Sequence, residues 1–381
     1  GMVRRHPEDP RYFATDRGET FFPLGANVCW AGPRGTFDYD DWLSRYARSG
    51  CNLIRVWLSP FWTTFAMNTP ESGFDAIDLG NAWRLDHVVQ MAEKLGIRIM
   101  PCIDSFNILR STERAHGNYE DAPYARMRGG PLRRPLDYFT HPRSLRAYRN
   151  RLRYLVARYG YSTSIFAWEL WNEVNIIDDY DSEVVARWHA TMARYLRQTD
   201  PWHHMVTTSF AGAKGDPAVF ALPELDFTQT HTYNNPDLAK TLAEQLRANG
   251  LPLADKPHLY GEFGIAGSGD DTAAKDPTGI HLHNALYASV GLPLAGAPMT
   301  WWWDTYVHAK NLYGIFAAFS RWVAGFDFAA EKAHPARLEI VRSDFELAEP
   351  ATLKLVKGTW SPAPVSYTHL RAHETSLHLV C

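Results

Sequence analysis

Two segments of the sequence end an apolar run with a glutamate. One is Trp168-Glu169-Leu170-Trp171-Asn172-Glu173, and the other is Leu259-Tyr260-Gly261-Glu262-Phe263-Gly264. Glycoside hydrolysis needs such a pair, because one protonated carboxyl helps the leaving oxygen depart while one ionised carboxylate attacks or activates water. A buried ion pair with an arginine would explain either glutamate alone, but that explanation is weaker for the two together.

The elements that must position these glutamates follow a regular alternation. From Phe21 to Phe326, short apolar runs alternate with longer segments of helical period, which is typical of βα units feeding a parallel sheet. Eight strands are predicted, at Phe22–Val28, Asn52–Leu58, Ile97–Asp104, Ile165–Trp171, His204–Ser209, Phe227–Tyr233, His258–Phe263 and Met299–Trp303. The two glutamates therefore lie at the ends of the fourth and seventh strands.

The connections between these elements differ on the two sides of the strands. A helix is predicted over His141–Tyr159, and Gly50, Gly96 and Gly250 end helical segments shortly before the next strand. The loops that leave the strands are long, at Ser59–Arg84, Ser105–Thr140 and Gly264–Gly279. This asymmetry predicts an α/β fold, a (β/α)8 TIM barrel with its active site at the C-terminal face. An open doubly wound sheet is disfavoured, because no Gly-x-Gly-x-x-Gly follows the first strand.

Composition narrows the class of ligand. The 381 residues hold 39 Lys and Arg against 42 Asp and Glu, a net charge of −3, with no basic run suited to nucleic acid. No apolar stretch approaches the roughly 20 residues that cross a bilayer. Fourteen tryptophans suit a groove that stacks on sugar rings. We expect a neutral or weakly charged carbohydrate substrate, no nucleic acid or membrane partner, no cofactor and no metal; Asp270-Asp271 is interpreted as solvated surface. Localisation and oligomeric state stay open.

The ordered motifs resemble the retaining glycosidases that include glycoside hydrolase family 5. Besides Asn172-Glu173 and Glu262, the chain has Asn52-Leu53-Ile54-Arg55 on the second strand, His231-Thr232-Tyr233 on the sixth and Trp301-Trp302-Trp303 on the eighth. Within that family, Trp-Glu-Leu-x-Asn-Glu and the opening run from Gly25 to Trp30 are most similar to β-mannanases and their bacterial relatives. The departure is Asp104-Ser105-Phe106-Asn107, which lacks the histidine that many members carry.

The resemblance implies a role for each matched residue. Glu262 would attack the anomeric carbon, and Glu173 would act as acid and then as base, with net retention. Arg55 would keep Glu262 ionised, while burial would raise the pKa of Glu173. Asn172 would hold the sugar 2-hydroxyl, and Tyr233 would hydrogen-bond the nucleophile.

Polar and aromatic residues near the strand ends, including those already named, are predicted to contact substrate. This set comprises Arg55, Asn172, His231, Tyr233, Trp303, Trp301, Asn27, Trp30, Trp57 and Asp104, and Trp62 is a further aromatic candidate. Of the tryptophans on the eighth strand, Trp303 is favoured as the subsite floor because it is closer to the barrel mouth. Glu169 is expected in a buried ion pair. Trp168 and Trp171 are expected on opposite sides of their strand.

The chain is divided into a catalytic domain at residues 1–328, a short β extension at 329–364, and a tail at 365–381. Alternation in Leu338–Val341 and Thr352–Val356 predicts strands of the extension, whereas the tail resembles translated sequencing adapter and is expected to be non-native. The predicted function is a retaining β-glycoside hydrolase acting on a mannan- or glucan-type chain. The alternatives are an exo-acting glycosidase or transglycosylase using the same site, and a carbohydrate-binding barrel without turnover.

Overall fold

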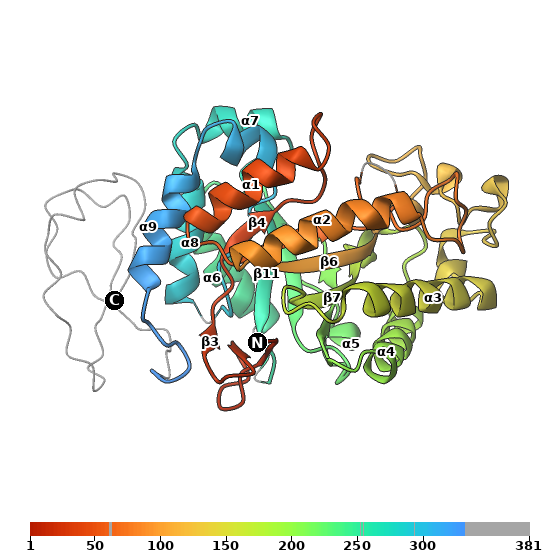
Figure 1. Ribbon diagram of the computed structural model, residues 1–381, viewed down its shortest axis with the longest axis horizontal. Coiled ribbons are helices and arrows are strands. Elements are labelled where there is room, and N and C mark those ends of the chain that lie inside the picture. Colours follow the sequence, from red (N-terminus) through yellow and green to blue (C-terminus); the bar gives the residue numbers. More distant parts are fainter. Residues whose placement is uncertain (61–62, 252, 254, 293, 332–381) are drawn as a thin grey trace, which may run out of the picture.

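A ring of parallel strands forms the centre of the structure (Figure 1). This computed structural model describes residues 1–60, 63–251, 253, 255–292 and 294–331. Five strands pair in chain order, namely β4 (Gly25–Asn27), β5 (Leu53–Trp57), β6 (Arg98–Ser105), β7 (Ala167–Asn172) and β8 (Met205–Thr207). Three more pair in parallel, namely β9 (Ser209–Phe210), β10 (Thr228–Tyr233) and β11 (His258–Gly264). Because only Thr208 separates β8 from β9, these two short pieces together occupy the place of the predicted fifth strand.

The ring closes at Thr300. This residue forms parallel bridges with Ala26 of β4 and with Phe263 of β11. The predicted eighth strand is thus reduced to a single bridging residue among the described residues, and Trp303 begins the π-helix η6 (Trp303–His308) instead of ending a strand. Closure nevertheless gives the (β/α)8 arrangement, with the carboxyl ends of all the strands at one face.

Helices surround the ring. They are α1 (Phe37–Arg48), α2 (Leu79–Leu95), α3 (Pro142–Tyr159), α4 (Ser182–Thr199), α5 (Pro217–Phe220), α6 (Leu238–Asn249), α7 (Gly269–Lys275), α8 (Ile280–Gly291) and α9 (Tyr313–Val323). The last helix, α9, packs against both α8 and α1, as a closed barrel requires. Gly96 and Gly250 cap α2 and α6 in the left-handed conformation, so the predicted helix ends are confirmed there.

The loop after β6 is the longest connection at the C-terminal face. It carries four short 3-10 helices, η1 (Phe106–Leu109), η2 (Tyr119–Asp121), η3 (Arg126–Arg128) and η4 (Pro135–Phe139). The loop after β7 carries a fifth, η5 (Val174–Ile176). The two loops contact each other through η1 and η5, so they form one wall beside the end of β7.

A small antiparallel sheet closes the opposite end of the barrel. It consists of β1 (Val3–Arg5), β2 (Phe13–Thr15) and β3 (Thr20–Phe21). Phe13 inserts edge-on against Phe166 and Phe227, with ring centroids 5.2 Å away in both cases. Together with Leu53, Met100 and other side chains of the strand beginnings, these rings form a separate apolar cluster. The sequence did not predict this sheet. Because it covers the end at which the strands begin, the end at which they finish is left open for an active site.

Several predictions concern other parts of the chain. Trp62, the predicted strands Leu338–Val341 and Thr352–Val356, and the tail at 365–381 lie outside the described residues. Among the described residues, no helix has the length and apolar character needed to cross a membrane.

Candidate active site

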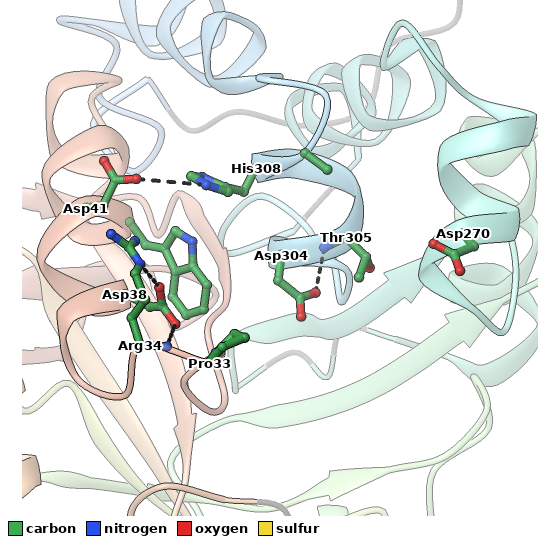
Figure 2. A pocket seen from close by; sticks show the side chains of 11 residues that line it. Pro33, Arg34, Asp38, Asp41, Asp270, Asp304, Thr305 and His308 are labelled. Atoms are coloured by element: carbon green, nitrogen blue, oxygen red, sulfur yellow. Dashed lines mark hydrogen bonds and ion pairs between the residues drawn. The ribbon is translucent and has the colours of Figure 1, made fainter.

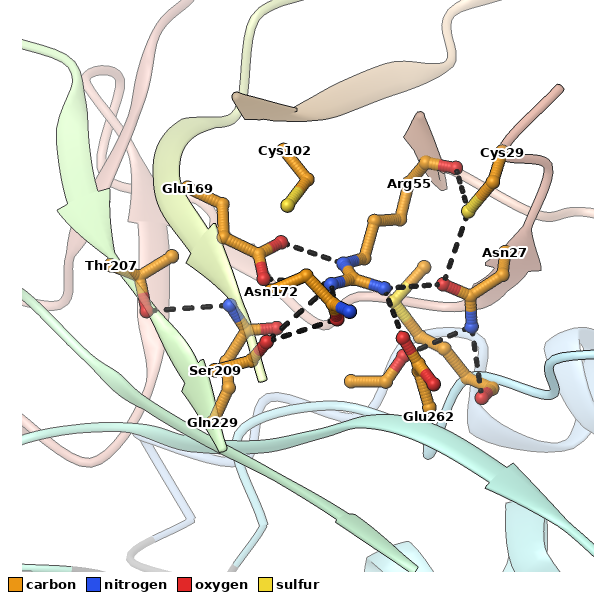
Figure 3. A network of polar contacts seen from close by, with 12 residues as sticks. Asn27, Cys29, Arg55, Cys102, Glu169, Asn172, Thr207, Ser209, Gln229 and Glu262 are labelled. Atoms are coloured by element: carbon orange, nitrogen blue, oxygen red, sulfur yellow. Dashed lines mark hydrogen bonds and ion pairs between the residues drawn. The ribbon is translucent and has the colours of Figure 1, made fainter. Parts of the chain in front are cut away.

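Arg55 lies at the centre of a buried polar network inside the barrel (Figure 3). Its guanidinium binds both oxygens of Glu169, at 2.6 and 2.7 Å, and donates to Glu262 Oε1 at 2.6 Å. It also donates to Asn172 Oδ1 at 2.6 Å and to Asn27 Oδ1 at 3.1 Å. The bidentate pair fixes the plane of the guanidinium. The expected buried ion pair of Glu169 is therefore confirmed, and Arg55 holds Glu262 in a fixed position.

Glu262 is 4% exposed and receives two strong donors. Arg55 binds one carboxylate oxygen, and the Tyr233 hydroxyl donates to the other at 2.6 Å. Burial raises the pKa of this carboxyl above its ordinary value, while Arg55 and the Tyr233 hydrogen bond oppose the shift. Both predicted contacts of Glu262 are present.

Glu173 follows β7 in a left-handed conformation, with φ of 51° and ψ of 48°. A non-glycine residue rarely adopts this conformation outside functional sites and turns. Its backbone N–H donates to Ser209 Oγ at 3.2 Å, and no arginine hydrogen-bonds its carboxylate among the described residues. Burial raises the pKa of Glu173 to about 7, although Arg55 and then Arg110 oppose the shift. Much of this carboxyl therefore stays protonated near neutral pH.

His231 lies between the two glutamates. Its Nδ1 is 2.8 Å from Glu173 Oε1 and 3.4 Å from Glu262 Oε2. Burial lowers the pKa of His231 to about 4, so the ring is neutral at pH 7. One oxygen of each carboxylate and a nitrogen of this ring all lie within 4.8 Å of one another. The glutamates of the fourth and seventh strands thus meet across the barrel mouth.

The register of the strands explains this meeting. In the pairing of β10 with β11, the register shifts between Thr230 and His231, so that His231 pairs with Glu262. A bulge re-aims the side chains that follow it. The end of β7 is also irregular, because Glu169 and Asn172, three positions apart, both reach Arg55.

Three residues expected to bind sugar are fully buried in the structure. Asn27, Arg55 and His231 are all 0% exposed, and each contacts protein groups. The Asn27 side-chain amide donates to the carbonyls of Gly261, Met299 and Thr300 while its oxygen accepts from Arg55. These residues position the glutamates, because their polar contacts are with groups of the barrel strands and with Glu173 and Glu262 themselves.

Asp104 is a further correction. Its side chain is 0% exposed and pairs with Arg151 of α3, which is 3% exposed. Arg151 Nη1 donates to Asp104 Oδ1 at 3.1 Å, and the Tyr138 hydroxyl also donates to this carboxylate. The end of β6 therefore directs Asp104 outward, toward α3 and the long loop, where it cannot reach a ligand at the mouth.

This pair leads to a prediction about stability. Asp104→Asn would leave Arg151 charged and unpaired in a buried position, and breaking such a pair costs about 3–5 kcal/mol. We expect urea unfolding to show a loss of this size. Arg128→Gln removes the exposed pair with Asp121 and is expected to cost less than about 1 kcal/mol. Equal losses in the two variants would contradict a buried role for Asp104.

The aromatic residues at the mouth form one cluster. Trp30 packs edge-on against Trp57, Trp301 and Trp303, with centroids 5.7, 5.5 and 4.9 Å away. Trp303 is 1% exposed and Trp57 is 4% exposed, whereas Trp30 and Trp301 are only partly buried. The ring of Trp303 thus offers almost no surface on which a sugar could stack, contrary to the expectation. The exposed indole surfaces belong to Trp30 and Trp301.

Trp168 and Trp171 also differ from expectation. Trp168 donates to Asp200, and Trp171 packs against Trp188 of α4, so both lie on the helix-facing side of β7. They are core residues. Ser209 was missed by sequence reasoning, although it contacts the Glu173 backbone and lies 3.4 Å from Asn172 Oδ1. Ser209 could have been identified as a candidate, because it is a polar residue at the end of the predicted fifth strand.

A separate pocket of about 670 Å³ opens between the start of α1 and η6 (Figure 2). Arg34, Trp42 and His308 line it. Four carboxylates also line it, namely those of Asp38, Asp41, Asp270 and Asp304. Arg34 pairs with Asp38 at 2.7 Å, and His308 lies 3.8 Å from Asp41. Neither glutamate of the candidate site lines this pocket.

Comparisons with known proteins agree with this geometry. Residues 15–286 match the family described as Cellulase (glycosyl hydrolase family 5). The chain is 27% identical over 294 residues to a probable mannan endo-1,4-beta-mannosidase F of Aspergillus oryzae, covering 68% of this chain and 60% of that protein. It is 29% identical over 210 residues to mannan endo-1,4-beta-mannosidase A of Aspergillus aculeatus, covering 53% and 52%. The chain thus spans about 60% of the length of the first of these relatives.

Solved structures of the same fold are also similar. The endo-1,4-beta-mannanase from Rhizomucor miehei superimposes with a TM-score of 0.61 at 16% identity, covering 84% of this chain and 100% of that one. An exo-beta-1,4-mannosidase from Opitutaceae bacterium strain TAV5 gives 0.57 at 18% identity, covering 91% and 67%. These likenesses establish the barrel. With a family match that spans most of the chain, they lead to one conclusion: the chain belongs to glycosyl hydrolase family 5.

Proposed function

We propose that this chain is a retaining β-glycoside hydrolase that cleaves the β-1,4 linkages of mannan within the chain. The observation that carries the proposal is the pair Glu173 and Glu262, whose nearest oxygens are within 4.8 Å across the barrel mouth. Retaining enzymes need a short separation, whereas inverting enzymes leave room for water at about 6.5–9.5 Å. The names of the curated relatives support mannan as the substrate.

The different environments of the two glutamates support different roles. Glu262 holds its charge against Arg55 and Tyr233, so it attacks the anomeric carbon as the sugar–oxygen bond breaks. Glu173, with its raised pKa, transfers its proton to the departing oxygen. In the second step, Glu173 takes a proton from water, and the water oxygen displaces Glu262 from the same carbon. Two inversions give net retention.

Other residues complete the proposed site. The Asn172 amide nitrogen uses one N–H on Ser105 Oγ at 3.1 Å, and its second N–H is proposed to bind the sugar 2-hydroxyl. Trp30 and Trp301 are proposed to stack on sugar rings, since their surfaces are partly exposed. We propose that residues 1–328 are the catalytic domain.

A screen of purified protein tests the proposal. Mannan, β-glucan, xylan and aryl glycosides are offered separately, and NMR identifies the first-formed anomer. We expect hydrolysis of mannan with β-anomeric product, and a mixture of oligosaccharides early in the reaction. Release of mannose alone from chain ends would instead favour exo action. The exo-mannosidase from Opitutaceae has the same fold. No hydrolysis of any substrate would contradict an enzymatic function.

The pH dependence offers a second test. The first step needs Glu173 protonated, so kcat/KM should fall as pH rises through about 7. It also needs Glu262 ionised, and the raised pKa of that carboxyl places the acidic limb above the ordinary glutamate range. We expect a bell-shaped profile of kcat/KM from initial rates on mannan. Full activity retained to pH 9 would contradict the assignment of Glu173 as the acid.

A further inference from the structure

Arg110 follows η1 on the wall formed by the loops after β6 and β7, and its charge acts on Glu173. Its neighbours in the chain are both held by Asp178, because the Asp178 N–H donates to Leu109 O at 2.9 Å and the Ser111 N–H donates to Asp178 Oδ2 at 2.7 Å. The Arg110 carbonyl accepts from the Tyr119 N–H at 2.9 Å. The backbone of Arg110 is therefore fixed relative to Asp178, which follows the end of β7 by six residues.

The side chain of Arg110 has an unusual environment. Its guanidinium lies over the Phe106 ring, 5.6 Å from the centroid, and its Nε is buried without a hydrogen-bond partner. Within the described part of the chain, no side-chain hydrogen bond or ion pair of Arg110 is found. Burial lowers the pKa of this half-buried guanidinium. The carboxylates of Asp178 and Glu173 act on Arg110 electrostatically, but neither forms an ion pair or a hydrogen bond with its guanidinium among the described residues. A partly desolvated guanidinium whose N–H donors are not all used is unfavourable.

Three other arginines of the same loop have exposed side chains and carboxylate partners. Arg114, Arg128 and Arg134 pair with Asp178, Asp121 and Asp137, and their side chains are 46%, 52% and 63% exposed. Each of these cations has both solvent and a carboxylate. The Arg110 side chain is more buried than any of these three and has no ion pair with a carboxylate among the described residues. An anion supplied from outside the chain would complete its environment.

The position of Arg110 indicates which part of a substrate it would meet. A proton donor must lie beside the oxygen that leaves, so the groups around Glu173 and away from Glu262 surround the leaving group. Arg110 acts electrostatically on Glu173, whereas the groups that act most on Glu262 are His231, Arg55, Glu173 and Tyr233. Arg110 thus belongs to the leaving-group side of the site.

We propose that Arg110 forms a leaving-group subsite for a carboxylate, so that the enzyme favours glycans with an acidic, uronic-acid-type unit on the departing side of the cleaved bond. This inference rests on the proposed hydrolase function. A guanidinium suits the role because its planar set of N–H donors matches a carboxylate. The Phe106 ring, 5.6 Å from the guanidinium carbon, would restrict the motion of the guanidinium.

Matched aryl glycosides test the proposal. The probes are 4-carboxyphenyl β-mannobioside and its methyl ester, which differ only by the charge on the leaving group. For each enzyme, the ratio of kcat/KM for the acid to that for the ester is measured. A charge-assisted hydrogen bond corresponds to about a tenfold change, so we expect this ratio to fall about tenfold in Arg110→Gln relative to the parent. Comparing ratios between enzymes cancels the intrinsic reactivity of the two phenols.

Two further variants serve as controls. Arg128→Gln removes the same charge from the same loop at an exposed position and should keep the parent ratio. Arg110→Lys keeps the charge and should restore part of the preference. Loss of Arg110 should also move the basic limb of the kcat/KM profile to higher pH, because this cation lowers the pKa of Glu173. A merely structural role would not shift that limb.

The outcomes separate this inference from the proposed function. If the parent hydrolyses the ester and Arg110→Gln keeps the parent ratio, the subsite is overturned while the hydrolase function stands. If the parent cleaves neither glycoside nor mannan, the function is contradicted. Titration of both probes into Glu262→Ala, with and without Arg110→Gln, then decides the subsite by binding: about tenfold tighter binding of the acid that depends on Arg110 supports it, and equal binding overturns it.

Discussion

Glu262→Ala is expected to lower kcat on mannan by at least about 10⁴-fold while polysaccharide binding stays measurable. The reason is that the covalent step has no other carboxylate in position, and loss of a catalytic nucleophile generally costs this much or more. The fold should survive, because Arg55 keeps its bidentate pair with Glu169 and its contact with Asn27 Oδ1. Initial rates and mannan affinity electrophoresis provide the measurements.

Adding azide to the Glu262→Ala variant tests the assignment of the nucleophile more directly. A small anion can enter the space left by the Glu262 carboxylate and attack the anomeric carbon once, so the product should be the α-glycosyl azide. Tyr233→Phe is the matched control, since it removes only the hydroxyl that donates to Glu262 Oε2. We expect a loss of about 10- to 100-fold for this variant, in line with one strong hydrogen bond to a charge. Parent-like turnover by Glu262→Ala would show that the nucleophile lies elsewhere.

Glu173→Gln is expected to reduce kcat/KM on mannan by about 10²–10⁴-fold, the usual contribution of a general acid. The loss should depend on the leaving group. With 2,4-dinitrophenyl β-mannobioside, departure needs little protonation, so a rapid burst of phenol should precede a slow steady state in which water attacks without its base. Azide should now give the β-glycosyl azide, because Glu262 remains in place. Stopped-flow absorbance and product NMR detect both effects.

The same variant should be more stable than the parent at alkaline pH. The pKa of Glu173 is raised to about 7 in the folded state, so the parent loses stability as pH rises from the unfolded-state pKa to about 7, and the cost is constant above that. Below the unfolded-state pKa both states are protonated and no cost arises. Glutamine removes that cost. We therefore expect the Tm difference between Glu173→Gln and the parent to grow from pH 5 to pH 8. A difference that is constant with pH would argue against a perturbed Glu173 carboxyl.

Much of the site could be predicted from local sequence. The order of apolar runs and helical segments placed Glu173 and Glu262 at the ends of two parallel strands, and parallel strands in a closed barrel end at one face. The motif around Arg55 and the His231-x-Tyr233 pair placed the residues that the structure brings against Glu262. These features depend on chain order and strand periodicity, which a sequence contains directly.

Side-chain direction at the strand ends could not be predicted in the same way. Asp104 turns outward to Arg151, Asn27 is occupied by three carbonyls, and Trp303 is buried at the start of a π-helix. Strict alternation fails where a strand bulges or ends early, as β11 does at Gly261, opposite the step from Thr230 to His231. The direction of each side chain then depends on the helices and loops packed against it.

The sequence by itself therefore determined the class of fold, and it placed Glu173, Glu262 and Arg55 on their strands, because residue type and spacing carry that information. Tertiary structure decided which neighbours reach the mouth. It left Trp30 and Trp301 partly exposed and buried Trp303, and it joined the loop that carries Arg110 to the loop after Glu173 through the contacts of Asp178. The physical reason is that loop packing and burial arise from contacts between segments far apart in the chain, and no local pattern specifies them.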